Sequence, residues 1–359
     1  MPAPGGARLP ARTPRRGTAP PDAAPGHDGC RAAAGRHRPP VIAGSIVICT
    51  HNRAGLLARS VRTALDEART CDAEVVVVDN ASTDDTATVL PTLRERDDPL
   101  RVVYEPRLGL SAARNCGLAE VRSTVAVFLD DDAVPRPGWL AAHLKLYTAP
   151  AVACVGGRIV VQLPAARPPW LTPPLEKALT AYDLGAPTRR YDPGDEYPCG
   201  ANLSYRVSTA QALGGFSLLV GPRGRRLLQH DDTDLCCRIE RAGGEMIYAH
   251  EAVVDHHVLP ERLVPGWFLA HHWEHGQSAA VFHLRNFELR RALGRLRWHY
   301  RPHILRVPYV PRDPVDPARL LAECRRREAL GYLVGVLRGL PRRHALRRDM
   351  AAPVGGLAP

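Results

Sequence analysis

The sequence VAVFLDDD, residues 125–132, is the most informative indication of the fold class of this chain. Five apolar residues followed by three carboxylates predict a buried strand that delivers acids to the carboxyl edge of a parallel sheet. In α/β proteins this edge is where ligands bind. Because like charges this close repel each other, a hard cation or a metal-bound phosphate is their natural partner, and an acidic turn or helix cap is the simpler alternative.

Strands and helices alternate around this stretch. Three further apolar runs predict strands, at residues 45–49, 74–79 and 101–104. The intervening segments predict helices, at residues 54–69, 82–95 and 111–121. The first of these helices places Leu57, Val61 and Leu65 on one face. Four alternations with short connections predict a parallel sheet covered on both faces, an α/β sandwich of the nucleotide-binding kind.

The rest of the chain divides by composition. Residues 1–40 are rich in proline, alanine and arginine, and we expect a disordered basic tail. Residues 41–260 form the predicted α/β domain, with later strands at 152–161 and 245–250. Residues 164–198 hold eight prolines and predict an irregular insertion at the ligand edge. Residues 261–359 are predicted to be a helical, basic C-terminal extension.

The charge balance restricts the partners. The chain has 359 residues and a net charge of +11, and Lys145 and Lys177 are its only lysines. This excess favours phosphorylated ligands or an anionic membrane surface, and no nucleic-acid-binding motif accompanies it. An apolar stretch between arginines at 325–348 could lie in a membrane interface.

The cysteines and the absence of long apolar runs indicate the cellular compartment of the protein. The nine cysteines are scattered and odd in number, which does not resemble a disulfide framework. No apolar run reaches the roughly 18 residues that a spanning helix requires, and no secretory signal is visible. We therefore expect a cytoplasmic protein, with the inner face of the plasma membrane as a further option.

Five polar motifs accompany these strands and helices in a fixed order. They are VICTHNR (47–53), VDNASTD (78–84), GLSAARN (109–115), DDD (130–132) and DDTDL (231–235). Together, and in this context, they resemble the motifs of the family 2 glycosyltransferases over about residues 44–260. The resemblance implies the GT-A fold, a Rossmann-like, mostly parallel sheet flanked by helices, and a nucleotide-diphosphate sugar as donor.

By this resemblance, residues after the first strands hold the donor. Thr50 and Asn52 follow the first strand, and Thr50 offers backbone and hydroxyl groups to the nucleoside. Asp79 is expected to accept the imide N–H of a uracil or a comparable edge of another base, although capping the next helix is its simpler role. Arg114 is expected to reach the nucleoside or the diphosphate, with a surface salt bridge as the alternative.

The same resemblance implies a divalent metal. Asp130 and Asp132 match the family's DxD motif, in which the first acid commonly contacts ribose and the last binds the metal. Mg²⁺ or Mn²⁺ would neutralise the charge of the leaving diphosphate. Asp131 is assigned to donor binding, because three successive acids permit more than one register. His257 is assigned as a further metal ligand, and an ordinary loop histidine is the alternative.

The DDTDL motif corresponds to the family's Glu-Asp motif, whose second acid deprotonates the acceptor hydroxyl. Asp232 is therefore the expected catalytic base and Asp231 an acceptor contact, although the first position here is Asp instead of Glu. Asp234 is a competitor for the base, and an acidic helix N-terminus is the alternative for the whole motif. Gly200 and Asn202 match a segment beneath the acceptor pocket, where glycine admits close backbone approach.

The expected activity is metal-dependent glycosyl transfer to a hydroxyl acceptor, with inversion implied by the family alone. The acceptor could be lipid-linked, a polysaccharide or a small molecule. A sugar-nucleotide pyrophosphorylase is one alternative, but it would require a glycine-rich phosphate loop that residues 50–55 do not provide. A non-catalytic carbohydrate- or nucleotide-binding module is the other, and the intact acids at 130–132 and 231–232 argue against it.

Overall fold

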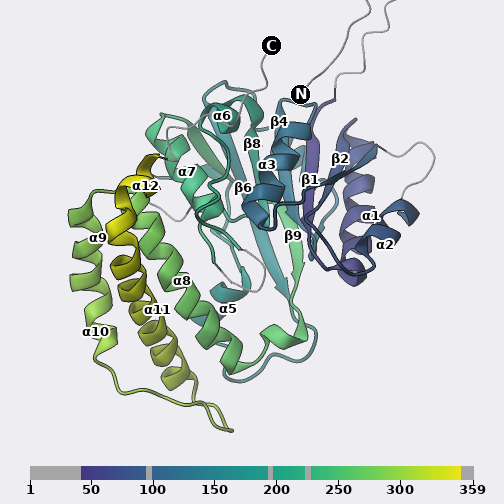
Figure 1. Cartoon of the computed structure of the whole chain (residues 1–359). Coiled ribbons are helices and arrows are strands. Elements are labelled where there is room, and N and C mark those ends of the chain that lie inside the picture. Colours follow the sequence, from purple (N-terminus) through teal and green to yellow (C-terminus); the bar gives the residue numbers. More distant parts are fainter. Residues whose placement is uncertain (1–41, 94–98, 193–196, 223–227, 349–359) are drawn as a thin grey trace, which may run out of the picture. The chain divides into compact units, whose positions relative to one another are not determined.

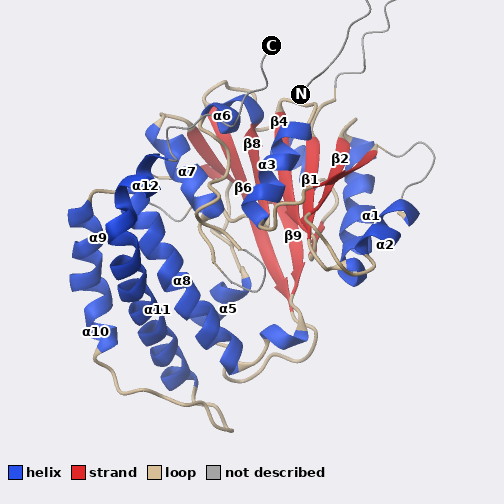
Figure 2. Cartoon of the chain, viewed as in Figure 1, coloured by secondary structure: helices blue, strands red, loops and turns tan. Residues whose placement is uncertain are grey.

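The computed structural model describes residues 42–93, 99–192, 197–222 and 228–348 (Figure 1). The predicted disordered tail, residues 1–40, lies outside the described residues. Within the described part a central sheet is flanked by helices, and further helices form a separate layer beside it (Figure 2). This is the expected α/β class, with a central sheet flanked by helices.

Nine strands form the sheet in the part of the chain that the structure describes. They are β1 (Ser45–Thr50), β2 (Glu74–Asp79), β3 (Leu100–Tyr104), β4 (Val125–Asp130), β5 (Ala133–Pro135), β6 (Val152–Gln162), β7 (Arg189–Arg190), β8 (Asn202–Arg206) and β9 (Glu245–His257). Eight of them run in the order β3-β2-β1-β4-β8-β6-β9-β5, and β7 pairs with β9. The pairs among β3, β2, β1 and β4 are parallel, whereas β8 is antiparallel to both of its neighbours.

Seven helical segments belong to the α/β part. They are α1 (Ala54–Thr70), α2 (Thr86–Thr92), α3 (Leu110–Glu120), α4 (Trp139–Leu144), α5 (Pro173–Glu176), α6 (Val207–Ala212) and α7 (Asp231–Arg241), with a short 3-10 turn η1 (Lys177–Leu179). The predicted apolar face of α1 is buried, at Leu57, Val61 and Leu65. Strand order reverses at β1, since β2 lies on one side of it and β4 on the other, and such a switch point opens a crevice at the strands' carboxyl ends.

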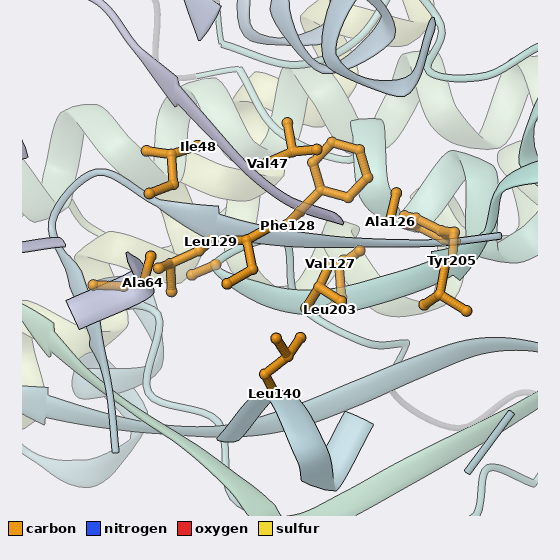
Figure 3. Close-up of a cluster of buried hydrophobic side chains, with 14 of the residues drawn as sticks. Val47, Ile48, Ala64, Ala126, Val127, Phe128, Leu129, Leu140, Leu203 and Tyr205 are labelled. Atoms are coloured by element: carbon orange, nitrogen blue, oxygen red, sulfur yellow. The ribbon is translucent and has the colours of Figure 1, made fainter. Parts of the chain in front are cut away.

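The core holds β4 firmly in the sheet. Phe128 on β4 packs edge-to-face against Tyr205 on β8 and against Phe216, with ring centroids 6.0 and 5.2 Å apart. Such aromatic pairs contribute about 0.5–1.5 kcal/mol beyond their buried area. Leu140 of α4 and Leu203 of β8 lie in the same cluster (Figure 3). The strand that carries the three successive aspartates is therefore fixed from both faces.

The structure differs from the strand predictions outside the parallel part of the sheet, most clearly at β8 and β9. The strand predicted at 245–250 continues to His257, because β9 pairs with β6 along most of its length and with β5 near its end. Residues 202–206, which carried no strand prediction, form β8 between β4 and β6. Both outcomes depend on pairing with distant strands, which local sequence does not encode.

The remaining helices begin after β9. They are η2 (Pro260–Arg262), α8 (Pro265–Asn286), α9 (Leu289–Arg295), the π-helical turn η3 (Leu296–Tyr300), α10 (Arg301–Ile304), α11 (Pro317–Gly339), η4 (Leu340–Arg342) and α12 (Arg343–Arg348). Glycines allow α8 and α11 to pack closely. A Cβ on Gly276 would lie 2.0 Å from the Glu328 carbonyl oxygen, and one on Gly331 would lie 2.1 Å from the carbonyl oxygen of Trp273.

This packing accounts for the apolar stretch between the arginines of 325–348. Gly331, Tyr332, Gly335 and Val336 are buried, and the Tyr332 hydroxyl donates to the carbonyl of Ala292. The stretch predicted to face a membrane is thus mostly occupied by helix–helix contacts. No helix among the described residues is long and apolar enough to cross a membrane.

Candidate active site

The carboxyl ends of β1, β2 and β4 meet at one edge of the sheet. The register pairs Thr50 with Asp79 across β1 and β2, and Cys49 with Asp130 across β1 and β4. Parallel neighbours end together, so the polar residues that follow each strand gather at this edge. The strand-end motifs predicted from the sequence are therefore brought together in space.

Two of the residues predicted to bind the donor serve the loops instead. The Asp79 carboxylate is buried and accepts a hydrogen bond from the backbone N–H of Ser82, at 3.1 Å. The Asn52 side-chain oxygen accepts the N–H of Thr83 at 2.7 Å, and the Asn52 backbone has a positive φ of 54°. Asn80 lines the neighbouring cavity, whereas Asp79 is not among the described residues that line it.

The side chains of Thr50 and Asp131 are hydrogen-bonded to each other. The Thr50 hydroxyl donates to Asp131 Oδ2 at 2.8 Å, and Ser60 donates to the Asp131 carbonyl at 2.9 Å. Burial, together with the neighbouring Asp132 charge, raises the pKa of Asp131 to about 7. Both residues line the cavity at the strand ends, and Asp131 anchors the DDD turn to β1 and α1.

Asp132 is the most strongly paired acid of the DDD motif. Its carboxylate accepts from Arg53 at 2.9 Å and lies 3.1 Å from His256 Nε2 and 3.6 Å from Arg262. Burial would raise the pKa of Asp132, but the hydrogen bond from His256 and the nearby positive charges hold it well below its usual range. Three basic side chains therefore converge on one carboxylate.

Asp130, Asp132 and His256 form a donor set that could hold a metal ion. One ligand atom from each lies within 4.8 Å of the others. Burial raises the pKa of Asp130 against the opposing charge of Arg114. Burial lowers the pKa of His256, but its contact with Asp132 outweighs this and leaves the pKa above its ordinary value.

His256 occupies the place for which the sequence suggested His257. Because successive residues of a strand point to opposite faces, only one of the two imidazoles can face Asp132. The backbone N–H of His257 donates to the Asp132 carbonyl at 2.8 Å, while the His256 ring contacts the Asp132 carboxylate. The geometry thus favours His256 over His257 as a ligand.

Arg114 connects the DDD motif to the DDTDL motif. Its Nη1 donates to Asp231 Oδ2 at 2.6 Å, and its Nη2 donates to Asp130 Oδ1 at 3.3 Å and to the Gly200 carbonyl at 3.2 Å. Arg114 is only 4% exposed, so its guanidinium is committed to these partners. Burial raises the pKa of Asp231, with Arg114 opposing it. Asp231 is thus a buried partner of Arg114.

Asp232 is the second residue of α7, and it lines the cavity. Its Oδ2 accepts the backbone N–H of Gly200 at 2.6 Å, and its Oδ1 accepts the N–H of Thr233 at 2.7 Å. A Cβ at Gly200 would lie 2.5 Å from Arg114 and 2.9 Å from Asp232 Oδ2. Glycine is therefore required here by close approach, as the sequence predicted for this segment.

Asp234, the competitor for the base, is fully buried. Its carboxylate accepts from Arg285 at 2.8 Å, from Asn286 at 2.6 Å and from Arg238 at 3.0 Å. These bonds tie α7 to the end of α8. Asp234 is thus a structural junction and does not line the cavity among its described residues.

Asn202 does not lie where an acceptor contact requires it. It is fully buried, and its side-chain oxygen accepts from Trp139 Nε1 at 2.7 Å and lies 2.9 Å from His143 Nε2. Its amide donates to the carbonyls of Arg158 and Ala252. Every polar atom of its side chain is satisfied inside the sheet layer, so the predicted acceptor role of Asn202 is not retained.

Two adjoining cavities flank the acids. A cavity of about 280 Å³ contains Thr50, Arg53, the DDD motif and His256, and a cavity of about 370 Å³ contains Arg114, Gly200, Asp231 and Asp232. Five residues line both, Asp130 and Arg262 among them. The two acidic motifs therefore face one continuous depression from two sides.

Several residues of the larger cavity had no sequence signal. Lys177, Tyr182 and Tyr197 come from the proline-rich insertion, whose position at the ligand edge was predicted but whose residues were not. Trp267 and His271 come from α8. His275 of α8 also lines this cavity, and its ring stacks near that of His271. Only the docking of α8 against the α/β part brings them there.

Comparisons with known proteins agree with this arrangement. The family described as Glycosyl transferase family 2 matches residues 45–210. The glucosyl-dolichyl phosphate glucuronosyltransferase of Haloferax volcanii is 24% identical over 67% of this chain and 77% of its own length. The pre-mycofactocin glycosyltransferase of Mycobacterium tuberculosis is 32% identical over 59% of this chain, and this chain spans 42% of its length.

Solved structures resemble the fold. The mannosyltransferase PcManGT from Pyrobaculum calidifontis, in complex with GDP-Man and Mn²⁺, covers 85% of this chain and 78% of its own, with 21% identity and a TM-score of 0.50. GalNAc-T7 with UDP, GalNAc and Mn²⁺ covers 86% of this chain and 59% of its own, with 16% identity and a TM-score of 0.53. At these identities the likeness concerns the architecture alone.

Proposed function

Because this chain belongs to the family 2 glycosyltransferases, we propose that it moves a sugar from a nucleotide-diphosphate donor onto a hydroxyl acceptor, with a divalent metal and inversion at the anomeric carbon. The observation that carries this proposal is the single depression shared by two acidic motifs. The donor side holds Asp130, Asp132 and His256, and the acceptor side holds Asp232.

The donor set fits a divalent metal by its chemistry. Asp130 and Asp132 would hold the ion with oxygen ligands, and His256 would add a nitrogen. Carboxylates suit Mg²⁺ and Mn²⁺, and an imidazole in the set favours Mn²⁺ of the two. When bound, the metal would neutralise the negative charge that develops on the leaving diphosphate. His257 is not part of this proposal.

The chain's own cations complement the same leaving group. Arg53 and Arg262 lie 2.9 and 3.6 Å from Asp132 and line the donor cavity. A nucleoside diphosphate entering there would exchange part of this internal pairing for phosphate oxygens, to which guanidinium groups bind in bidentate fashion. We assign these two arginines to the diphosphate. Thr50 and Asp131 support the turn that presents the ligands.

Asp232 is the proposed base. Its carboxylate faces the larger cavity, where an acceptor hydroxyl would place its proton within hydrogen-bond reach. The Gly200 N–H, 2.6 Å away, fixes the orientation of this carboxylate. Arg114 neutralises the charge of the adjacent Asp231, so that Asp231 does not compete with Asp232 for the proton of the acceptor. Attack on the face opposite the leaving diphosphate would invert the anomeric centre.

The acceptor is proposed only as a hydroxyl compound. One relative acts, by its name, on a glucosyl-dolichyl phosphate, and another on pre-mycofactocin, so relatives span lipid-linked and small-molecule classes. A polysaccharide acceptor fits the open cavity equally. Tyr182, Tyr197 and Trp267 line this cavity, so a sugar or another ring bound there would meet aromatic side chains.

A nucleotide-sugar panel tests the proposal. Purified full-length protein is incubated with individual nucleotide sugars and Mn²⁺ or Mg²⁺, and nucleoside diphosphate release is measured. We expect slow, metal-dependent hydrolysis of one donor that is lost in Asp132→Ala. Formation of a nucleotide sugar from nucleoside triphosphate and sugar phosphate would instead indicate a pyrophosphorylase. Donor binding without any turnover, with every acceptor class tried, would indicate a binding module.

A further inference from the structure

The segment that connects α8 to α11 carries an unusual charge. Residues 289–312 contain seven arginines and neither aspartate nor glutamate. The helical part, α9, η3 and α10, lies on the side of the α8–α11 pair farthest from the sheet, and the rest is the loop that leads from α10 to α11 (Figure 1). We call residues 289–312 the basic surface. Neither the proposed donor site nor the acceptor cavity uses any of them.

One face of this segment is occupied by packing. Ala292 and Tyr300 are buried and Leu296 and Ile304 are partly buried, at positions that recur every four residues. This periodicity places the four residues on one side of a continuous helical stretch. Tyr300 stacks on Tyr332 of α11, with ring centroids 4.2 Å apart. The opposite side must therefore face away from the protein.

Large apolar groups as well as arginines are exposed on the helical stretch and on the loop that follows it. Trp298 is 75% exposed, Leu305 77%, Val307 89% and Val310 71%, which are the highest values among the exposed large apolar residues of the described chain. Arg297 lies over the Trp298 ring, 4.9 Å from its centroid. An exposed tryptophan beside arginines and aliphatic side chains is the composition of a surface that lies in a bilayer interface.

We propose that the basic surface binds anionic lipid bilayers peripherally. The arginines would contact lipid headgroups, and Trp298, Leu305, Val307 and Val310 would enter the boundary between headgroups and acyl chains. A nucleic acid would satisfy the arginines and could stack on Trp298, but it would leave the three aliphatic groups exposed. An anionic bilayer accommodates both the arginines and the aliphatic groups, and we therefore favour it as the partner.

This placement differs from the one suggested by the sequence. The apolar stretch within 325–348 packs on α8, and Leu337, 64% exposed, is its main outward apolar residue. The basic surface precedes that stretch in the sequence, and the inner side of its helical part packs on α11. Binding at this surface does not depend on the proposed glycosyl transfer, because it can be measured without donor or acceptor.

Vesicle co-sedimentation of the full chain tests the proposal. Vesicles of phosphatidylcholine alone are compared with vesicles that also contain phosphatidylglycerol. We expect binding only to the anionic vesicles, weakened by high salt, and reduced at least about tenfold in the double variant Trp298→Ser, Leu305→Ser. The matched control Leu337→Ser should bind as the wild type does. Equal melting temperatures verify that the variants are folded.

A second measurement locates the contact. Lipids brominated near the headgroup quench the fluorescence of a tryptophan that enters the interface. Part of the quenching should disappear in Trp298→Phe, which keeps an apolar ring at this position. No binding to anionic vesicles at low salt, undiminished binding by the double variant, loss of binding in Leu337→Ser alone, or binding to RNA but not to vesicles would each overturn the proposal.

Discussion

Arg114 Nη1 lies 2.6 Å from Asp231 Oδ2, and both side chains are buried. This ion pair joins α3, which follows the third strand of the parallel half, to α7, which begins more than a hundred residues later. The second guanidinium nitrogen reaches Asp130 and the Gly200 carbonyl. One arginine therefore sets the distance between the proposed metal ligands and the proposed base.

Replacing this arginine by lysine should disconnect the two motifs. In Arg114→Lys the charge is kept, but an ammonium group cannot reproduce the forked hydrogen bonds to Asp231, Asp130 and Gly200. We expect kcat/KM to fall by about 10² or more, since misplacement of reacting groups by about 1 Å has that effect. The control is Arg62→Lys on the exposed face of α1. Turnover close to wild type in Arg114→Lys would contradict the positioning role.

Asp231 and Asp232 should respond differently to loss of charge. Asp232→Asn should lower the rate by about 10²–10⁴ while donor affinity and melting temperature change little. Asp231→Asn removes the partner of a buried arginine and should lower the melting temperature, because an uncompensated buried charge is strongly destabilising. Rates, donor affinities and thermal melts of both variants are compared. An active Asp232→Asn protein would show that the base is another residue.

The Gly200 position tests whether close packing positions the base. A Cβ there would lie 2.5 Å from Arg114 Nη2, which is closer than real Cβ contacts allow. Gly200→Ala should therefore displace Asp232 or Arg114 and reduce kcat by about 10². The matched control is Gly294→Ala in α9, where no atom lies within 4 Å and where alanine favours the helix. Equal activity in the two variants would contradict the role of Gly200.

Glu328 links the stability of the C-terminal helices to pH. It lies 3.1 Å from His272 and 3.5 Å from His275, and these contacts outweigh burial and hold its pKa well below the ordinary value of 4.5. An acid whose pKa is lower in the folded state than in the unfolded state stabilises the fold at pH values above its unfolded-state pKa. This stabilisation is lost as the pH falls. Glu328→Gln should thus cost about 1.5–3 kcal/mol near pH 6 and less near pH 4.

Thermal melts across this pH range check the expectation. The exposed acid Glu288, changed to Gln, provides the control, because its side chain lies outside this cluster. The difference in melting temperature between wild type and Glu328→Gln should shrink as the pH is lowered toward 4. A difference that stays constant with pH would mean that the charge of Glu328 plays no part.

The parallel half of the fold could be predicted from the sequence for a physical reason. Three of its four strands, β1, β2 and β4, are continuous apolar runs, because both of their faces are buried, and each of the three ends at a polar residue. The ends of these runs therefore also located the acids of the DDD motif. By contrast, β8 and the end of β9 depend on distant pairing and were missed or shortened.

The site residues divide in the same way. Asp130, Asp132 and Asp232 could be singled out as candidates because Asp130 ends β4, Asp132 follows it closely and Asp232 lies in the first turn of α7. Choosing between His256 and His257 required the phase of β9 at its end, which a strand predicted to stop at 250 could not supply. Asn202 was misjudged because its neighbours Trp139 and His143 come from α4, which no local pattern connects to it.

The most direct test of the central claim is calorimetric titration of UDP and GDP into the full-length protein, with and without Mn²⁺. We expect the nucleotide of the preferred donor to bind only with the metal. Asp132→Ala and His256→Ala should each weaken this binding at least about tenfold, or about 1.4 kcal/mol. His257→Ala, altered one residue along the same strand, should bind as wild type does. Metal-independent nucleotide binding, or undiminished binding in Asp132→Ala and His256→Ala, would contradict the account.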